Sequence, residues 1–126
     1  MRRFVVLTHD YPVLHWDLML EKKAALRTWR LAHEPDGPGP IDAEELPDHR
    51  LAYLDYEGAV SGGRGTVRRF DRGEFMVVEE TAARVVVELE GKLLRGRATL
   101  EHHADSGRWS YSCAPRPGPL LEWPGR

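Results

Sequence analysis

Short runs of β-branched and aromatic residues, separated by turn-forming residues at a spacing of about ten positions, limit this chain to few folds. No stretch shows a convincing 3.6-residue period, so helices are not expected to build the core. The pattern therefore predicts an all-β protein, either an antiparallel β-barrel or a β-sandwich. The expected strands are residues 4–8, 14–21, 25–31, 66–70, 74–80, 84–90, 92–101 and 108–113.

Two proline-rich stretches interrupt this pattern. Residues 34–48 are rich in proline, glycine and acidic side chains, and we expect a long surface loop there with one helical turn at most. Residues 115–126 cannot form an interior strand because proline donates no hydrogen bond to a sheet. We expect this tail to wrap around the outside of the domain, with Leu120, Leu121 and Trp123 as its anchors.

Length and composition narrow the class of protein further. A chain of 126 residues suits one domain, which we expect to span residues 1–126. No run approaches the ~18 apolar residues of a membrane span, and the first apolar run ends at residue 7, too early for a signal peptide. A cytoplasmic protein with no membrane partner is expected. The single Cys113 excludes an internal disulfide and a zinc site built from thiolates.

The charge balance bears on nucleic-acid binding. A formal net charge of −2 argues against a non-specific nucleic-acid coat, although it leaves a local binding site open. Of the 18 basic residues only Lys22, Lys23 and Lys92 are lysines. Arginine is the better partner for phosphate because its guanidinium makes paired hydrogen bonds, but a genome-wide codon bias would produce the same preference.

The chemistry-bearing side chains are concentrated between residues 9 and 21. From residue 14 onward the side chains alternate strictly, which predicts a strand with one buried face and one face that carries the chemistry. The apolar face consists of Leu14, Trp16, Leu18 and Leu20, and the other face consists of His15, Asp17, Met19 and Glu21.

Three of these residues could hold a metal ion. Five residues separate His9 from His15 across a turn at Tyr11-Pro12, and Asp17 lies on the same strand face as His15. Two imidazoles and one carboxylate offer a three-point site for a divalent cation such as manganese, zinc or iron, with positions left for water and substrate oxygens. The alternative is an ordinary polar face on an edge strand.

Other candidates lie further along the chain. His49 and Tyr53 could donate protons or hydrogen bonds to a developing oxyanion, or they could be structural. Residues 62–65 could cradle a phosphate through backbone amides, but they lack the Lys-Ser/Thr of a phosphate-binding loop and also suit a hairpin turn. Residues 102–105 could contribute metal ligands or form a solvated turn.

The order of these residues resembles the 3′-phosphoesterase domain of bacterial DNA ligase D, which also occurs as a stand-alone protein. That family's pattern reads approximately F-V-V-x-x-H-D-x-x-x-L-H-Y-D-F-R-L-E, and residues 4–6, 9–10 and 14–21 follow it without a gap. The resemblance extends over about residues 4–113. Its further matches are Trp29 and residues 48–53 (D-H-P-L-x-Y), 57–58 (E-G), 65–67 (G-T-V), 71–73 (D-x-G) and 91–96 (G-x-K-L-x-G).

The resemblance implies a small antiparallel β-barrel that holds a manganese-type ion, with zinc as an alternative, through His9, His15 and Asp17. It places His49 and Tyr53 at the scissile phosphate. Members of the family trim the 3′ ends of DNA or DNA/RNA during end joining. They remove a 3′-terminal ribonucleoside and then the remaining 3′-phosphate. The resemblance thus implies nucleic-acid ends and an end-joining ligase or polymerase as partners, and we expect a monomer.

One departure from the family pattern concerns phosphate binding. Met19 occupies the position at which the family has an arginine that contacts phosphate, and a thioether cannot replace charged donors. If residues 22–24 form a three-residue loop, Arg27 faces Met19 across the hairpin and restores the charge as a substrate-binding residue. Two alternatives therefore accompany the enzyme: a catalytically weakened module that binds nucleic-acid ends or repair partners, and a phosphoesterase for a small substrate.

Overall fold

The computed structural model describes residues 1–116, a range that contains strands and one short 3₁₀-helix but no α-helix. The strands are β1 (Arg2–His9), β2 (His15–Lys22), β3 (Ala25–Leu31), β4 (Ile41–Arg50), β5 (Gly58–Ala59), β6 (Thr66–Glu80), β7 (Arg84–Gly91), β8 (Arg95–His103) and β9 (Arg108–Pro115). The 3₁₀-helix η1 spans Leu51–Leu54. The prediction of an all-β protein is confirmed.

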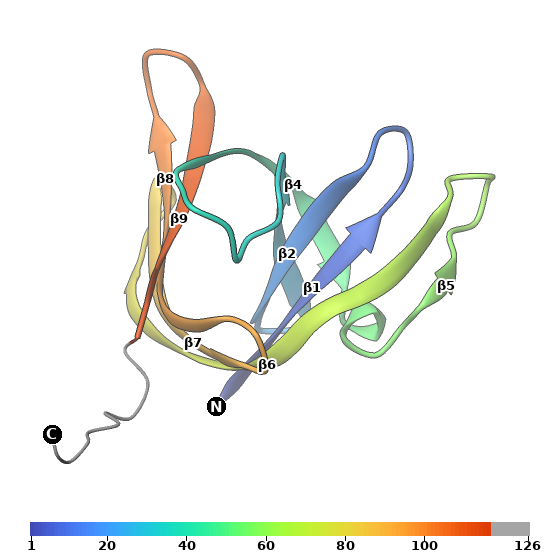
Figure 1. Cartoon of the computed structure of the whole chain (residues 1–126), viewed down its shortest axis with the longest axis horizontal. Coiled ribbons are helices and arrows are strands. Elements are labelled where there is room, and N and C mark those ends of the chain that lie inside the picture. Colours follow the sequence, from blue (N-terminus) through green and yellow to red (C-terminus); the bar gives the residue numbers. More distant parts are fainter. Residues whose placement is uncertain (117–126) are drawn as a thin grey trace, which may run out of the picture.

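Eight of these strands close into a barrel (Figure 1). Their order is β1-β2-β3-β4-β9-β8-β7-β6, all neighbours are antiparallel, and β6 pairs back onto β1. The short β5 is added beside β6. Closure leaves no long unpaired edge around the ring, which is how barrels avoid the exposed hydrogen-bonding groups of open sheets. The barrel form of the predicted fold is therefore confirmed, and the sandwich is not.

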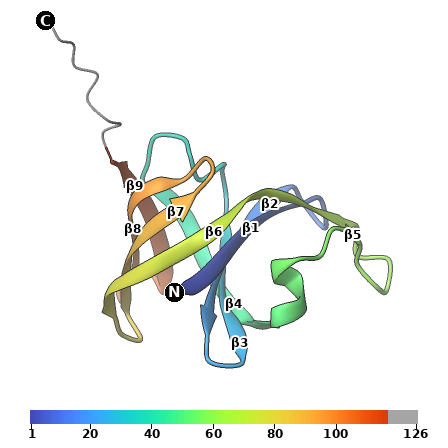
Figure 2. The ribbon, with the colours of Figure 1, turned by 90° about the horizontal axis from the view of Figure 1, so that it is seen from below.

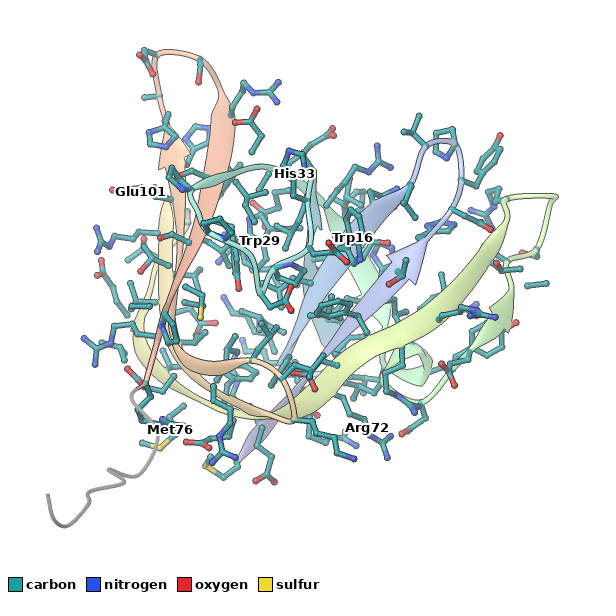
Figure 3. All side chains as sticks on the ribbon, viewed as in Figure 1. Trp16, Trp29, His33, Arg72, Met76 and Glu101 are labelled. Atoms are coloured by element: carbon teal, nitrogen blue, oxygen red, sulfur yellow. The ribbon has the colours of Figure 1, made fainter. Side chains whose placement is uncertain are left out.

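The main core fills the inside of the barrel. Every one of the eight strands contributes a buried side chain to it, and Trp29 at its centre is fully buried. Figure 3 shows Trp29 within the ring of strands, whereas Arg72 and Met76 lie at the outer edge. The members of this core include Phe4, Val6, Leu18, Leu20, Trp29, Leu31, Phe75, Val87, Leu89, Leu100, Trp109 and Tyr111.

A second, smaller core lies on the outer face of β1, β2 and β3, beneath η1. It comprises Val5, Leu7, Met19, Leu26, Leu54 and Val67. Figure 2 shows η1 and β5 outside the ring of strands. Leu54 of η1 packs into this core with Met19, and the polar face of β2 is buried: His15, Asp17 and Met19 are only 4%, 3% and 1% exposed. The strand is therefore not half-solvated, as an edge strand would be.

The structure shortens the predicted surface loop. β4 begins at Ile41, so residues 41–48 form a strand and not a loop. Ile41 and Ala43 are buried while Asp42 and Glu44 are exposed, which is the alternation of a half-buried strand. Pro47 is accommodated at an irregularity where the register of β3 and β4 shifts, so its missing N–H interrupts no regular ladder.

Residues 71–73 lie within the continuous β6 and do not form the predicted turn. The Asp71 carboxylate is buried and accepts hydrogen bonds from the backbone N–H groups of residues 92–94. Those residues form the connection between β7 and β8, so β8 begins at Arg95, three residues later than predicted. Asp71 therefore orders a distant turn, and Gly73 packs against the carbonyl of Glu90 on β7.

Leu120, Leu121 and Trp123, the expected anchors of the tail, lie outside the described residues. Within residues 1–116, no helix has the length and apolar character needed to cross a bilayer.

Candidate metal centre

The β1–β2 hairpin brings the two predicted histidines together. His9 and His15 are the last paired residues of the hairpin before its loop, so they are direct cross-strand neighbours. Their ring centroids are 4.8 Å apart. Asp17 follows His15 on the same strand face, as the alternation predicted. The turn at Tyr11-Pro12 thus brings the His9 and His15 side chains into contact, although five residues separate them in the sequence.

The three side chains converge on one point. Asp17 Oδ2 lies 3.6 Å from His9 Nδ1 and 3.3 Å from His15 Nε2. One ligand atom from each residue lies within 4.8 Å of the others, and residues 1–116 hold no other cluster of this kind. The donor set of two imidazoles and one carboxylate is one that divalent transition ions prefer.

Two backbone carbonyls fix which ring nitrogens face the centre. His9 Nε2 lies 2.8 Å from the carbonyl oxygen of Arg64, and His15 Nδ1 lies 2.7 Å from that of Val13. A carbonyl oxygen can only accept, so each of these nitrogens carries the hydrogen and donates. His9 Nδ1 and His15 Nε2 are left with lone pairs beside Asp17, which is how metal-binding histidines are usually oriented.

The buried polar atoms of the cluster fit a cation. Within the described part of the chain, His15 Nε2 and Asp17 Oδ1 are buried without a hydrogen-bond partner. Such groups are costly unless something binds them. Burial alone would lower the pKa of His15, but in the protonated form a hydrogen bond to Asp17 and the charge of that carboxylate raise it. The cluster therefore attracts positive charge, whether a proton or a metal ion.

A cleft of about 230 Å³ opens onto this cluster and also contains His49 and Tyr53. Their ring centroids are 5.7 Å apart. His49 comes from the end of β4 and Tyr53 from η1, so the strand ends between them and a short 3₁₀-helix follows. His49 Nδ1 donates to the carbonyl oxygen of Pro47 at 2.9 Å, which leaves Nε2 free to exchange a proton.

The predicted contact between Met19 and Arg27 is wrong. The hairpin turn consists of two residues, 23 and 24, and not three. Met19 therefore pairs with Thr28, while Arg27 pairs with Leu20. A shift of one residue moves a side chain to the opposite face of the sheet. Arg27 consequently points away from the cleft.

Arg27 has a structural environment on the other face. Its Nε donates to Glu45 at 2.7 Å, and its terminal nitrogens donate to the carbonyl oxygens of Thr81 and Ala82. Its guanidinium also lies 4.8 Å from the ring centroid of Trp29. These contacts occupy its donors, and Arg27 is not among the residues that line the cleft. The structure does not support its predicted role in substrate binding.

Two arginine side chains line the cleft instead: that of Arg30, which the sequence analysis did not single out, and that of Arg64, from the segment 62–65 that was considered for its backbone amides. Arg30 on β3 pairs with Asp17 on β2, and its nearest carboxylate is Glu44 at 3.9 Å. Arg64 lies in the β5–β6 turn, where its guanidinium donates to the carbonyl and hydroxyl oxygens of Ser61. The signal that could have identified Arg30 is the length of the β2–β3 turn, because a two-residue turn places it opposite Asp17.

The two remaining candidate segments, residues 62–65 and 102–105, lie at turns, which was the structural alternative for each. Gly62 and Gly63 form a turn with φ angles of 76° and 67°, consistent with a hairpin turn. At the tip of β8, His103 Nε2 lies 2.9 Å from the hydroxyl of Ser110, and the His102 ring packs at a tilt against Trp109. Among residues 1–116, neither histidine belongs to a group able to hold a metal.

Comparison with known proteins gives two similarities. The family described as the DNA ligase D 3′-phosphoesterase domain matches residues 7–102 of this chain. The multifunctional non-homologous end joining protein LigD of Pseudomonas aeruginosa is 30% identical over 105 residues, which is 75% of this chain. The match spans only 12% of that protein. All residues named above as lining the cleft lie within the matched range.

Proposed function

This chain belongs to the DNA ligase D 3′-phosphoesterase domain family, and on that premise we propose that it is a metal-dependent 3′-phosphoesterase that processes 3′ ends in DNA repair. The substrates proposed are DNA or DNA/RNA ends that carry a terminal ribonucleoside or a 3′-phosphate. The observation that carries the proposal is that two predicted groups, the metal ligands and the proton donors, share one cleft. The name of the relative from Pseudomonas aeruginosa supports an end-joining context.

The proposed metal is a divalent ion, manganese in the first place and zinc as the alternative. The ion would be held by His9 Nδ1, His15 Nε2 and the Asp17 carboxylate, since these atoms converge. In each imidazole the other ring nitrogen makes the hydrogen bond to a backbone carbonyl, so the nitrogen that would face the ion is free. When bound, the ion supplies Lewis-acid polarisation of a nonbridging phosphate oxygen. The negative charge of Asp17 also balances part of the charge that such an ion brings into a buried position.

His49 and Tyr53 are proposed to act on the phosphate itself. In hydrolysis of the terminal linkage, a water oxygen forms a bond to phosphorus while the bond from phosphorus to the ribonucleoside oxygen breaks. His49 Nε2, held in place through Nδ1, is suited to give a proton to the departing oxygen. The Tyr53 hydroxyl can donate a hydrogen bond to a phosphate oxygen as negative charge develops.

The proposal is tested with purified protein, manganese and a primer-template whose primer ends in a 3′-phosphate. We expect release of inorganic phosphate, and loss of both turnover and manganese binding in His15→Ala. The matched control is His103→Ala, which removes an exposed histidine at the tip of β8, and it should retain both properties. Stoichiometric manganese binding without turnover in the parent protein would contradict the enzyme.

Met19 favours a second candidate function. It lines the cleft with a thioether and contributes no charge for phosphate. The alternative is therefore a module that keeps the barrel and the metal but only binds nucleic-acid ends or repair partners. The two candidates differ in whether the unmodified chain turns over its substrate.

A further inference from the structure

Binding a phosphate in this cleft calls for a positive side chain in addition to the metal centre. Among the described residues, the lining contains two guanidinium groups, those of Arg30 and Arg64. Met19 is fully buried in the second core and offers only a thioether. A positively charged side chain that binds phosphate in this cleft therefore comes from an element other than β2.

Arg64 is already engaged within its own turn. Its Nε lies 2.7 Å from the carbonyl oxygen of Ser61, and a terminal nitrogen lies 3.2 Å from the Ser61 hydroxyl. Its backbone carbonyl meanwhile holds the ring of His9. The guanidinium of Arg64 thus serves to shape the turn, and a phosphate would have to replace those contacts.

Arg30 is in the opposite situation. Its Nε is buried and has no hydrogen-bond partner within residues 1–116. Glu44 is the one carboxylate within 4.0 Å of the guanidinium in that range; it is 3.9 Å away, its side chain is 67% exposed, and such exposed pairs contribute little. The Arg30 side chain itself is 39% exposed, so a ligand can reach it. The Arg30 guanidinium therefore has N–H groups that can donate hydrogen bonds to a ligand.

The position of Arg30 directs those donors towards the metal centre. β3 is held on both sides by β2 and β4, and within it Arg30 lies opposite Asp17. Arg30 and His15 line both the cleft at the metal centre and a second cleft of about 290 Å³ beyond the β1–β2 loop. Arg30 therefore borders both cavities, and a substrate extending from one to the other would pass it.

We infer that Arg30 is the phosphate-binding residue of this cleft, in a role for which Met19 is unsuited. The inference rests on the proposed function of the same cleft. The guanidinium holds the phosphate oxygens through charge-assisted hydrogen bonds while the substrate lies against the metal centre. Because those bonds need a planar fork, lysine at this position keeps the charge and loses part of the binding.

The test measures affinity separately from turnover. Binding of a 3′-phosphate primer-template and the KM for its hydrolysis are measured for the parent chain, Arg30→Gln and Arg30→Lys, all with manganese. We expect Arg30→Gln to weaken binding by about 10- to 100-fold, the usual range for losing hydrogen bonds to a charged group. Arg30→Lys should fall between the two, and manganese affinity should not fall in either variant, because Arg30 is not one of the candidate metal ligands.

The matched control is Arg97→Gln. Arg97 is an exposed arginine on β8 that pairs with Glu88, away from the cleft, and its removal should leave substrate binding unchanged. Thermal melting of each variant checks the fold. If Arg30→Gln fails to fold, Arg30→Lys decides: a raised KM with unchanged manganese affinity supports the inference, and an unchanged KM overturns it.

The outcomes separate this inference from the proposed function. If the parent cleaves the primer and Arg30→Gln binds it equally well, the inference is overturned and the proposed function stands. If the parent binds the phosphate end without cleaving it, the proposed catalysis fails, while weaker binding in Arg30→Gln still supports the inference. If the parent neither binds nor cleaves the primer, both are overturned.

Discussion

At the scale of single residues, the cleft carries a thioether at position 19 and a guanidinium at position 30, on strands that are neighbours in the sheet. The pairing of Asp17 with Arg30 allows a cation on β3 to reach the space beside a residue on β2. The absence of charge at Met19 therefore does not remove positive charge from the cleft.

Met19→Arg tests this arrangement. We expect the parent chain to hydrolyse the 3′-phosphate primer, and the variant to gain less than about tenfold in kcat/KM, since one charge-assisted contact is already available. Met76→Arg adds the same charge on the exposed part of β6 and serves as the control. Steady-state hydrolysis with manganese gives the comparison. A large gain from an inactive parent would instead support the non-catalytic end-binding module.

The sequence could predict His9, His15 and Asp17 because a short turn and strict alternation are local features. Which arginine of β3 faces these three residues depends on the number of residues in the β2–β3 turn. With three residues in the turn Arg27 faces Met19, whereas with two residues Arg30 faces Asp17. Local patterns rarely distinguish these two turns, and a register error of one residue exchanges the faces of the strand.

At the scale of elements, the candidate metal centre depends on how β1 is joined to the start of β6. The Asp10 carboxylate accepts hydrogen bonds from the backbone N–H and the hydroxyl of Thr66, at 2.8 and 3.0 Å. These bonds hold the pKa of Asp10 below its usual value. They also position the turn whose Arg64 carbonyl fixes the tautomer of His9. The neighbouring Gly65 has a φ of 75° and no room for a side chain, because an added Cβ would meet Asp10 Oδ1 at 2.3 Å.

A pair of glycine variants isolates that contact. Gly63→Ala and Gly65→Ala both place alanine at a positive φ, but an added Cβ at Gly63 meets nothing within 4 Å. We expect Gly63→Ala to lower the free energy of unfolding by about 1 kcal/mol from backbone strain alone. Gly65→Ala should cost more and should also weaken manganese binding. Thermal melting and manganese titration measure the two effects, and equal behaviour of the two variants would contradict this role for Asp10.

The elements that sequence patterns misjudged are those ordered by distant contacts. The sequence predicts a loop over most of β4, because its proline and acidic residues obscure the alternation of the buried Ile41 and Ala43 with exposed residues. β6 reads as two strands because Asp71 and Gly73 resemble a turn. Their actual roles, accepting hydrogen bonds from residues 92–94 and packing against Glu90, belong to pairings across the barrel. No local rule reports such pairings.

At the scale of the whole molecule, the barrel provides two layers of packing around one functional cleft. The inner core fills the ring of strands, and the outer core, which includes Met19 of β2 and Leu54 of η1, lies on the face of β2 that carries the candidate metal ligands. Alternation and turn spacing predicted the all-β class, but the second core was missed because it requires η1 to fold against β1 and to place Leu54 in the cluster. This packing of η1 places Tyr53 beside His49.

The central claim is that this cleft trims nucleic-acid 3′ ends with a bound divalent metal. The most direct measurement is a time course on an end-labelled primer-template with a single 3′-ribonucleotide, run with manganese and with a chelator. We predict that a 3′-phosphate end appears first, that it is then converted to a 3′-hydroxyl end, and that neither product forms in the chelator. An unchanged primer in the presence of a chain that has bound manganese, or equal cleavage with the chelator, would contradict the account.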